Sequence, residues 1–235
     1  MKRSLNERNR SNKLTKLGYS TSEDAITWTL VSWLAEHPLR SLASLAKAVG
    51  IRSDVTPAVL LWGVPIAGSR GAEVRQAVIG VLDKLGERPN GRTEPDVVLD
   101  FGSDGIIVIE VKHLSPNDVQ PARHAGKFAK YVEGNPAFAD PDATTRSGFY
   151  ELARNWAVGS ALASDHPFAL INLGPDRLFR GRAGQDLAAF ERTLDQERHR
   201  TFRRLTWPDF LRIIAPDEPL PLWLNAWLAT RGIPA

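Results

Sequence analysis

The amino-acid sequence predicts an α/β fold. Segments with helical spacing of apolar residues alternate along the chain with short β-branched runs, an order typical of a sheet covered by helices. The clearest strand signal is a pair of apolar runs, 97–99 and 106–111, separated by a glycine-bounded turn at 102–105. These runs predict a β-hairpin over about residues 95–113. The chain is long enough for one domain with a sizeable core, and no repeat or linker divides residues 21–235.

The sequence also predicts the elements on either side of the hairpin. Upstream it predicts helices over 22–36, 41–49 and 72–85 and a strand over 58–65. The second and third of these helices are expected to end at Gly50 and Gly86, because glycine readily takes the left-handed conformation that closes a helix. Downstream it predicts a polar stretch over 115–147 with a short helix near 122–132, helices over 148–164, near 185–200 and around 207–229, and a strand over 167–173.

The composition excludes several kinds of site. The chain has no cysteine, which excludes disulfides, thiolate metal sites and a cysteine nucleophile. It contains no Walker loop, no dinucleotide-binding glycine motif and no histidine pattern of a zinc site. No signal-like apolar segment follows Met1 and no apolar run approaches membrane-spanning length, so a cytoplasmic protein with no membrane partner is expected.

Residues 1–20 are expected to form a flexible basic tail. They hold six basic residues against one acid, a charge of +5, whereas the whole chain carries +3 and the remaining residues therefore carry −2. Such a tail can follow a phosphate backbone, and the alternative is a solubilising terminus that contacts nothing. The candidates for nucleic-acid contact in the tail are Lys2, Arg3, Arg8, Arg10, Lys13 and Lys16.

Two ionisable residues lie at the end of the second hairpin strand. Glu110 and Lys112 are two residues apart and therefore point to the same side of the strand. A buried charge needs a partner, and Asp96 on the neighbouring strand is the expected one. Asp96 reaches their side only if the hairpin loop has an odd number of residues, most simply three. The alternative is an edge hairpin with a surface ion pair, but the nearly continuous apolar run favours a central strand buried on both sides.

The pattern of Asp96, Glu110 and Lys112, with Pro95 before and Val111 between, resembles that of the PD-(D/E)XK nuclease superfamily. Other segments that resemble the family are the helix at 150–156, the strand at 167–173, the Ser-Glu-Asp segment at 22–28 and Thr206-Trp207. The resemblance implies a restriction-endonuclease-like core, in which helices flank a central mixed β-sheet.

The resemblance further implies an endonuclease that hydrolyses phosphodiester bonds of DNA with Mg²⁺ or Mn²⁺, in restriction, defence or DNA processing. Asp96, Glu110 and the Val111 carbonyl would bind the ion, which polarises a phosphate oxygen and lowers the pKa of a bound water. Lys112 would orient that water or offset the charge that develops on the phosphate. DNA is the expected partner, with a homodimer as a further option, and the sequence does not separate DNA from RNA.

The superfamily usually adds a carboxylate from a helix upstream of the hairpin, and the sequence offers Glu23 and Glu73. Glu23 lies beside the apolar stripe of its helix, and the Ser-Glu-Asp resemblance favours it as a catalytic residue that holds a second ion or a metal-bound water. The alternative roles are local. Ser20 and Glu23 have the spacing of a capping box, and Glu73 is a favourable charge in a first helical turn.

Three further features bear on nucleic-acid binding. Glu151 and Arg154 on the helix after the hairpin are expected to face the site or the DNA. The competing class is a non-catalytic DNA-binding protein, either a degenerate nuclease fold or a helix-turn-helix regulator over 42–60. An arginine cluster near the end of the 185–200 helix is interspersed with acids, which favours a solvated helix face. Its members are Arg198, Arg200, Arg203 and Arg204.

Overall fold

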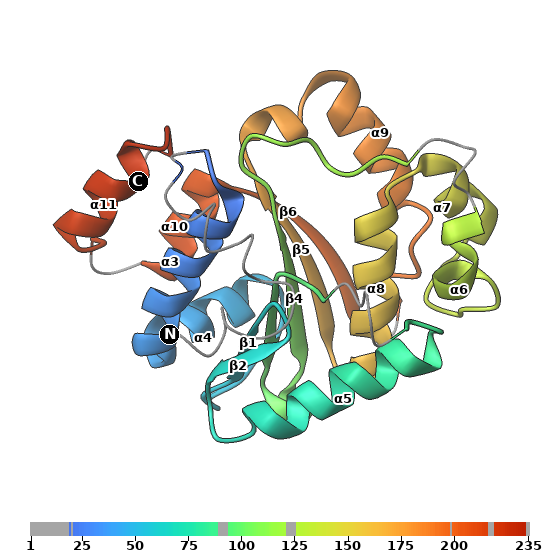
Figure 1. Ribbon diagram of the computed structural model, residues 1–235, viewed down its shortest axis with the longest axis horizontal. Helices are drawn as coiled ribbons and strands as arrows, with labels where there is room; N and C mark the ends of the chain where they lie inside the picture. Colours follow the sequence, from blue (N-terminus) through green and yellow to red (C-terminus); the bar gives the residue numbers. More distant parts are fainter. Residues whose placement is uncertain are drawn as a thin grey trace.

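The computed structural model describes residues 19, 21–88, 94–120, 126–197, 199–215 and 219–233. Except for Tyr19, the predicted basic tail lies outside these residues, and so do its six candidate nucleic-acid contacts. The described residues form the predicted α/β fold, an open six-stranded mixed sheet with helices on both faces (Figure 1). None of the helices in the described part of the chain is long and apolar enough to cross a membrane.

Most elements lie where the sequence predicts them. The strands are β1 (Ala58–Leu61), β2 (Val64–Ala67), β3 (Val97–Asp100), β4 (Ile106–Val111), β5 (Phe168–Gly174) and β6 (Arg200–Thr206). The helices are α3 (Glu23–Glu36), α4 (Pro38–Ala48), α5 (Gly71–Lys84), α6 (Ala129–Val132), α7 (Pro141–Ser147), α8 (Tyr150–Ala163), α9 (Gly181–Glu191), α10 (Trp207–Ile214) and α11 (Leu222–Ala229). Two short 3-10 turns are η1 (Gly102–Asp104) and η3 (Asp176–Leu178).

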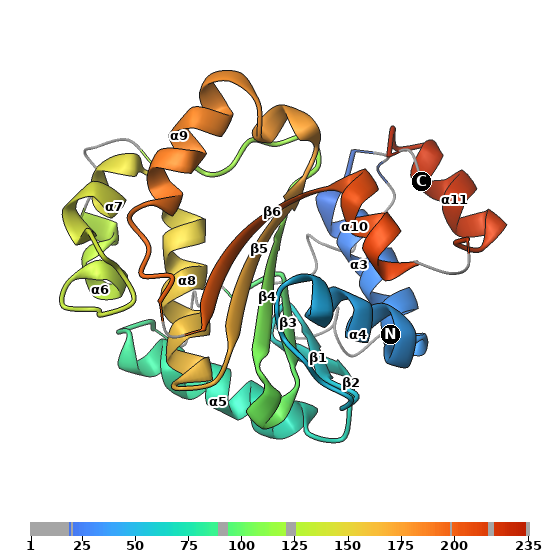
Figure 2. The same ribbon diagram turned by 180° about the vertical axis from the view of Figure 1, so that it is seen from behind.

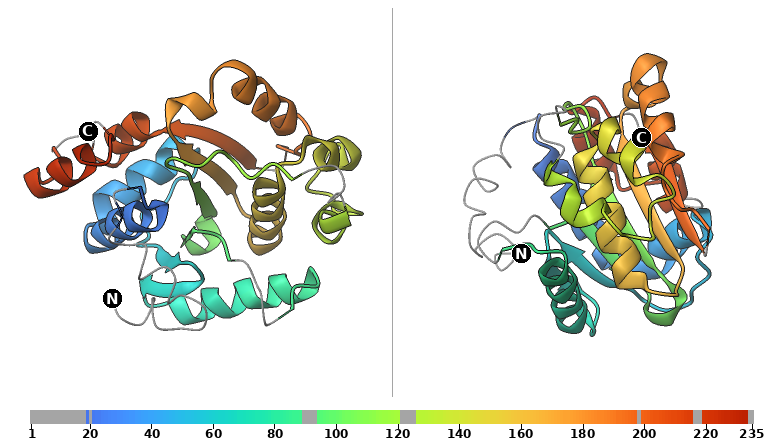
Figure 3. Two further views of the ribbon diagram at one scale, coloured as in Figure 1. Left: turned by 45° about the horizontal axis from the view of Figure 1, so that its top comes forward. Right: turned by 90° about the vertical axis from the view of Figure 1, so that its right-hand side faces the viewer.

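The sheet changes from antiparallel to parallel at its centre. The strand order is β2-β1-β3-β4-β5-β6, with β1 to β4 paired antiparallel and β4, β5 and β6 paired parallel. Parallel neighbours need a crossover, and α8 and α9 supply the two crossovers on one face of the sheet. The carboxyl ends of β4, β5 and β6 therefore lie side by side at one end of the sheet. The segment that follows β4 runs across this end of the sheet toward α7 (Figure 3, left).

Alternate residues of β4 pack against two layers of helices. Ile107, Ile109 and Val111 belong to a core with α3, α4 and α10, while Ile106 and Val108 belong to a core with α5, α8 and α9. Figure 2 shows the two layers from behind the view of Figure 1. All of β4 is buried. The prediction of a central strand is confirmed, and the alternative of an edge hairpin with a surface ion pair is wrong.

Two strands differ from the prediction. The apolar run 58–65 is a hairpin of β1 and β2, because Trp62 and Gly63 form its turn with φ of 50° and 70°. Positive φ at both turn residues gives the twist that a tight hairpin needs. The helix expected near 185–200 ends at Glu191, and the chain then forms the edge strand β6.

Two predictions about elements that could bind nucleic acid are wrong about their secondary structure. The helix-turn-helix over 42–60 is absent, because residues 51–57 contain no helix and β1 follows them. The arginine cluster lies on β6 and not on a helix, with Arg198 outside the described residues. Two of its members form ion pairs. Arg200 lies 2.8 Å from an Asp195 carboxylate oxygen, and Arg204 Nε donates to Glu191 at 3.0 Å.

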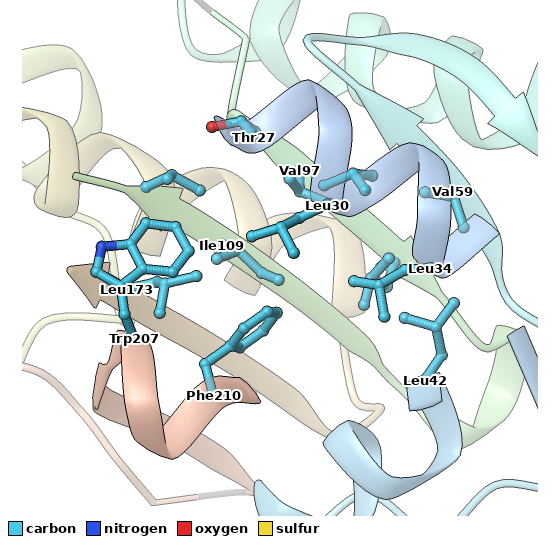
Figure 4. Close-up of a pocket in the computed structure, with 13 residues that line it drawn as sticks. Thr27, Leu30, Leu34, Leu42, Val59, Val97, Ile109, Leu173, Trp207 and Phe210 are labelled. Carbon is cyan, nitrogen blue, oxygen red and sulfur yellow. The ribbon is translucent and has the colours of Figure 1, made fainter. Parts of the chain in front are cut away.

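An apolar cavity of about 20 Å³ lies in the core between α3, α10 and the sheet (Figure 4). The hydroxyl of Thr27 and the indole N–H of Trp207 both lie in its lining and both donate to backbone carbonyls, of Glu23 and Lys112 respectively. A buried water needs two to four polar partners. This space is therefore a dry gap in the packing and not a ligand site.

Candidate functional site

The β3–β4 hairpin fixes the relative positions of the two predicted site carboxylates. Val97 lies opposite Ile109, and the same register places Asp96 opposite Glu110. The residues between the paired strand ends are 101–105, an odd number as the prediction requires but longer than the expected three. Residues directly opposite each other point to the same face of a sheet. Asp96 and Glu110 therefore share a face.

Lys112 is held between two carboxylates. Its ammonium nitrogen lies 2.8 Å from Glu110 Oε1 and 2.6 Å from Glu151 Oε2. The second oxygen of Glu110 accepts a hydrogen bond from Asn155 Nδ2 at 2.7 Å. The side chains of Glu110 and Lys112 are 5% and 9% exposed, whereas that of Glu151 is 26% exposed. Glu151 is therefore the member of this cluster that reaches solvent.

Helix α8 supplies the polar groups that surround Glu110. Glu151 and Asn155 are four residues apart and so lie on one face of the helix. Arg154 is buried, and its Nε and Nη2 donate to Asn155 Oδ1 at 3.2 and 3.1 Å. These bonds leave the Asn155 nitrogen to donate to Glu110. Of the two orientations expected for Glu151 and Arg154, the structure shows the one toward the site.

Burial and crowding perturb the ionisation of the cluster. Burial raises the pKa of Glu110 to about 8, and the charges of Asp96 and Glu151 act in the same direction against those of Lys112 and Arg154. Burial by itself would lower the pKa of Lys112, but the two carboxylates beside it outweigh this effect and raise that pKa. Burial would raise the pKa of Glu151, but Lys112 outweighs it and holds that pKa low. Facing carboxylates of this kind favour the uptake of a proton or a cation.

The stability of the metal-free protein is expected to fall as the pH rises from about 5 to about 8. Between its ordinary pKa of 4.5 and its folded pKa of about 8, Glu110 keeps a proton in the folded protein that the unfolded chain has released. Stability decreases with pH wherever the folded state binds more protons, here by at most about 5 kcal/mol. Urea unfolding in a chelating buffer measures the effect, and Glu110→Gln should flatten it. Parallel curves for the two proteins would show that Glu110 titrates normally.

Asp96 is half-buried at the amino end of β3. Its Oδ2 accepts a hydrogen bond from the Val111 backbone N–H at 3.0 Å, and its carbonyl accepts one from the Trp62 N–H at 2.9 Å. Strand β4 and the turn between β1 and β2 thus hold this residue. The Asp96 carboxylate is thereby fixed beside Val111, the residue whose carbonyl the resemblance assigns to the ion.

The donors at this end of the hairpin are hard oxygens. Mg²⁺ is usually bound by one or two carboxylates and keeps water or substrate oxygens as its other ligands. Asp96, Glu110 and the Val111 carbonyl fit that pattern. Among the described residues, no group of three or more His, Cys, Asp or Glu side chains could hold a metal ion. An ion at this place would therefore need ligands from water or substrate.

Glu23 lies in the other helical layer, at the first residue of α3. Its Oε1 accepts hydrogen bonds from the backbone N–H groups of His113 at 2.9 Å and Ser115 at 3.1 Å, and from the Ser115 hydroxyl. The capping-box interpretation is wrong, because Ser22 caps α3 and Glu23 is the first residue of the helix instead of the third. Ser20 itself lies outside the described residues. The contacts of Glu23 are with the segment that follows Lys112.

The other helix candidate, Glu73, points away from the sheet. Its side chain is 80% exposed and lies 3.9 Å from Arg70 one turn earlier. This is the first-turn charge that the alternative interpretation predicts. The structure therefore brings neither upstream carboxylate into the cluster around Lys112.

Two further side chains hold the segment after β4, and the sequence did not assign them a role. Arg177 Nη2 donates to the carbonyls of His113 and Leu114 at 2.8 and 2.7 Å. Trp207 Nε1 donates to the Lys112 carbonyl at 3.2 Å. Together with Glu23 they fix the backbone that carries Lys112. Of these bonds, the one from Trp207 is buried, and its loss would leave the Lys112 carbonyl without this partner at a cost in free energy.

Glu23→Gln is expected to lower stability by about 1 kcal/mol, because it removes the charge from three hydrogen bonds while keeping an acceptor oxygen. Glu73→Gln is the matched control and should change stability by less than about 0.5 kcal/mol. Urea unfolding measures both. If Glu23→Gln kept full stability and lost its metal response, Glu23 would serve an ion as the resemblance implies.

A row of polar residues across the sheet was also not predicted from the sequence. The parallel register places Asn172 beside Glu110 and Arg204 beside Asn172. Asn172 is fully buried, and its Nδ2 donates to Asn117 Oδ1 at 3.0 Å. Its signal in the sequence is an amide inside the apolar strand 167–173, at the level of Glu110. Asn155 is likewise an amide among apolar residues, here in a helix, and its spacing of four residues places it on the same helix face as Glu151.

No family model, no curated protein and no solved structure matches this chain. The function is therefore inferred from the geometry of the cluster and from the motif that it contains.

Proposed function

We propose that the protein is a metal-dependent nuclease that hydrolyses DNA phosphodiester bonds on a restriction-endonuclease-like core. The observation that supports this most is the register of the β3–β4 hairpin. It sets Asp96 opposite Glu110, and the Lys112 ammonium lies 2.8 Å from the Glu110 carboxylate. Two carboxylates and a lysine at one strand end are the parts that metal-assisted phosphoryl chemistry needs.

The residues have separate tasks in this proposal. Asp96, Glu110 and the Val111 carbonyl would hold Mg²⁺ or Mn²⁺, which when bound polarises a phosphate oxygen. Lys112 offsets the negative charge that develops on the phosphate. Glu151 keeps the lysine in place through its 2.6 Å contact, also when Glu110 is engaged with an ion. Asn155 orients Glu110 by donating to its second oxygen.

Incubation of the purified full chain with supercoiled plasmid DNA tests the proposal. Nicking or linearisation is expected with Mg²⁺ or Mn²⁺, and none with a chelator. Glu110→Gln, which keeps an acceptor for Asn155 and loses the charge, should not cleave. Equal cleavage with and without a divalent ion would show that the proposed metal-dependent mechanism is wrong. Binding of plasmid without cleavage under every ion would favour the non-catalytic DNA-binding alternative, and cleavage of RNA alone would change the substrate.

A further inference from the structure

A groove with a volume of about 330 Å³ lies beside the candidate site. Its walls come from the segment after β4, the end of α7, the start of α8, the turn η3 and one face of α9. These elements surround the carboxyl ends of the parallel strands (Figure 3, left). Such ends are the usual place for ligands in open α/β sheets, and the volume lies at the lower end of the range of small-molecule pockets.

Two connections join the groove to the site. Phe149 lines the groove and precedes Glu151, which contacts Lys112, by two residues. Asn117 lines the groove and accepts a hydrogen bond from Asn172, which neighbours Glu110 in the sheet. A substrate strand with its phosphate over Glu110 and Lys112 would therefore bring its adjoining nucleotide to this groove.

Asn117 presents an amide nitrogen to the groove. The residue is 7% exposed, and its Oδ1 is engaged by Asn172 at 3.0 Å. Within the described part of the chain, its Nδ2 has no hydrogen-bond partner. This nitrogen is not fully buried, so it reaches solvent at the groove, where an acceptor on a ligand can take the place of water. The groove thus offers a fixed donor to a ligand that carries an acceptor.

The rest of the lining suits a flat aromatic ligand with polar edges. Val119 is an apolar side chain that is 55% exposed at the groove, and Phe149, which is 3% exposed, lies in the groove floor. Arg146 and Asp186 are exposed at the same groove and offer one charge of each sign. A nucleobase combines apolar faces with acceptors and donors along its edge. Inside a duplex these faces are stacked, so a base must be unpaired or turned out to use the groove.

We propose that this groove holds an unpaired nucleobase of the substrate strand, next to the phosphodiester bond that is cleaved. The inference rests on the proposed nuclease function and names its substrate more closely. The substrate is a strand with an unpaired base, as in single-stranded DNA, a frayed end or a flipped nucleotide. Asn117 donates to the base edge, and the apolar wall contacts its face.

The test is a binding measurement with the full chain carrying Glu110→Gln, so that cleavage does not interfere. The probes are a fluorescent oligodeoxyadenylate of about 12 nucleotides and an abasic strand with the same number of phosphates. Stacking and edge contacts should make the adenylate bind about tenfold more tightly than the abasic strand. Ala183→Trp, which fills the groove from an exposed position of α9, should abolish this preference, and Asn117→Leu should reduce it.

Ala129→Trp is the matched control. Ala129 lines a neighbouring hollow of about 300 Å³, between α6 and α7, that shares only Arg146 with the groove, so this variant should keep the preference for bases. Equal affinity of the Glu110→Gln protein for both strands, or an unchanged preference in Ala183→Trp, would overturn the groove assignment even if plasmid cleavage is observed. If Ala183→Trp removes the preference but the unsubstituted protein cleaves no plasmid with any divalent ion, the groove assignment stands and the nuclease proposal is wrong.

Discussion

Replacing Asp96 with asparagine is expected to lower metal-dependent DNA cleavage by about a thousandfold while leaving the fold intact. Asparagine keeps a side-chain oxygen for the Val111 N–H, which now donates to Asp96 at 3.0 Å. It loses the charge that a divalent cation requires from a site with few protein ligands. Several kcal/mol of transition-state stabilisation disappear with the ion, which corresponds to this factor in rate. The measurement is the plasmid cleavage rate at saturating Mg²⁺.

Asp104→Asn is the matched control, because it makes the same chemical change in the loop at the other end of the same hairpin. It should keep wild-type cleavage. A second readout is the thermal stabilisation by Mg²⁺, about 2.7 kcal/mol at a hundredfold excess over the dissociation constant. Asp96→Asn should lose this stabilisation and Asp104→Asn should keep it. An Asp96→Asn protein that still responds to Mg²⁺ would place the ion elsewhere.

The hairpin shows why part of the site could be predicted from sequence. Strand periodicity alone sets Glu110 and Lys112 on one face, and the apolar run around them requires a central, buried strand. The position of Asp96 could be predicted only conditionally, because the register of the hairpin depends on the number of loop residues. The loop 101–105 satisfies the condition with two residues more than expected.

The residues that the sequence missed owe their positions to contacts across the fold. Helical periodicity places Asn155 on a buried face of α8, but it does not say that this face meets the end of β4. Likewise, Glu23 begins a helix of the opposite layer, and only the path of the segment after β4 brings its carboxylate to His113 and Ser115.

Strand β6 was missed for a related reason. Its sequence, Arg-Thr-Phe-Arg-Arg-Leu-Thr, is polar at most positions, and only Phe202 is buried. An edge strand has one neighbour and keeps charged side chains in solvent. The amino-acid composition of β6 therefore does not differ from that of a solvated helix face. It is the parallel pairing with β5 that makes this segment a strand.

Lys112→Met is expected to destabilise the metal-free protein by about 3 kcal/mol or more near pH 9. The lysine is the cation between Glu110 and Glu151, at 2.8 and 2.6 Å, and methionine fills similar space without charge. Its removal leaves a buried Glu110 facing Asp96 and Glu151, whose charges already raise the pKa of Glu110. The cost should shrink near pH 6, where Glu110 is protonated in the folded protein and carries no charge. Urea unfolding at the two pH values measures this difference.

The double variant Glu110→Gln/Lys112→Met separates the ion pair from simple loss of packing. With Glu110 neutral, the lysine has less charge to compensate, so the double variant should be more stable than the sum of the single changes by at least about 1 kcal/mol. Lys84→Met, at an exposed position in the last turn of α5, should change stability by less than about 0.5 kcal/mol. Additive effects in the double variant would mean that Lys112 and Glu110 do not stabilise each other. Lys112 would then be held by Glu151 alone, and Glu110 would depend on Asn155 for its position.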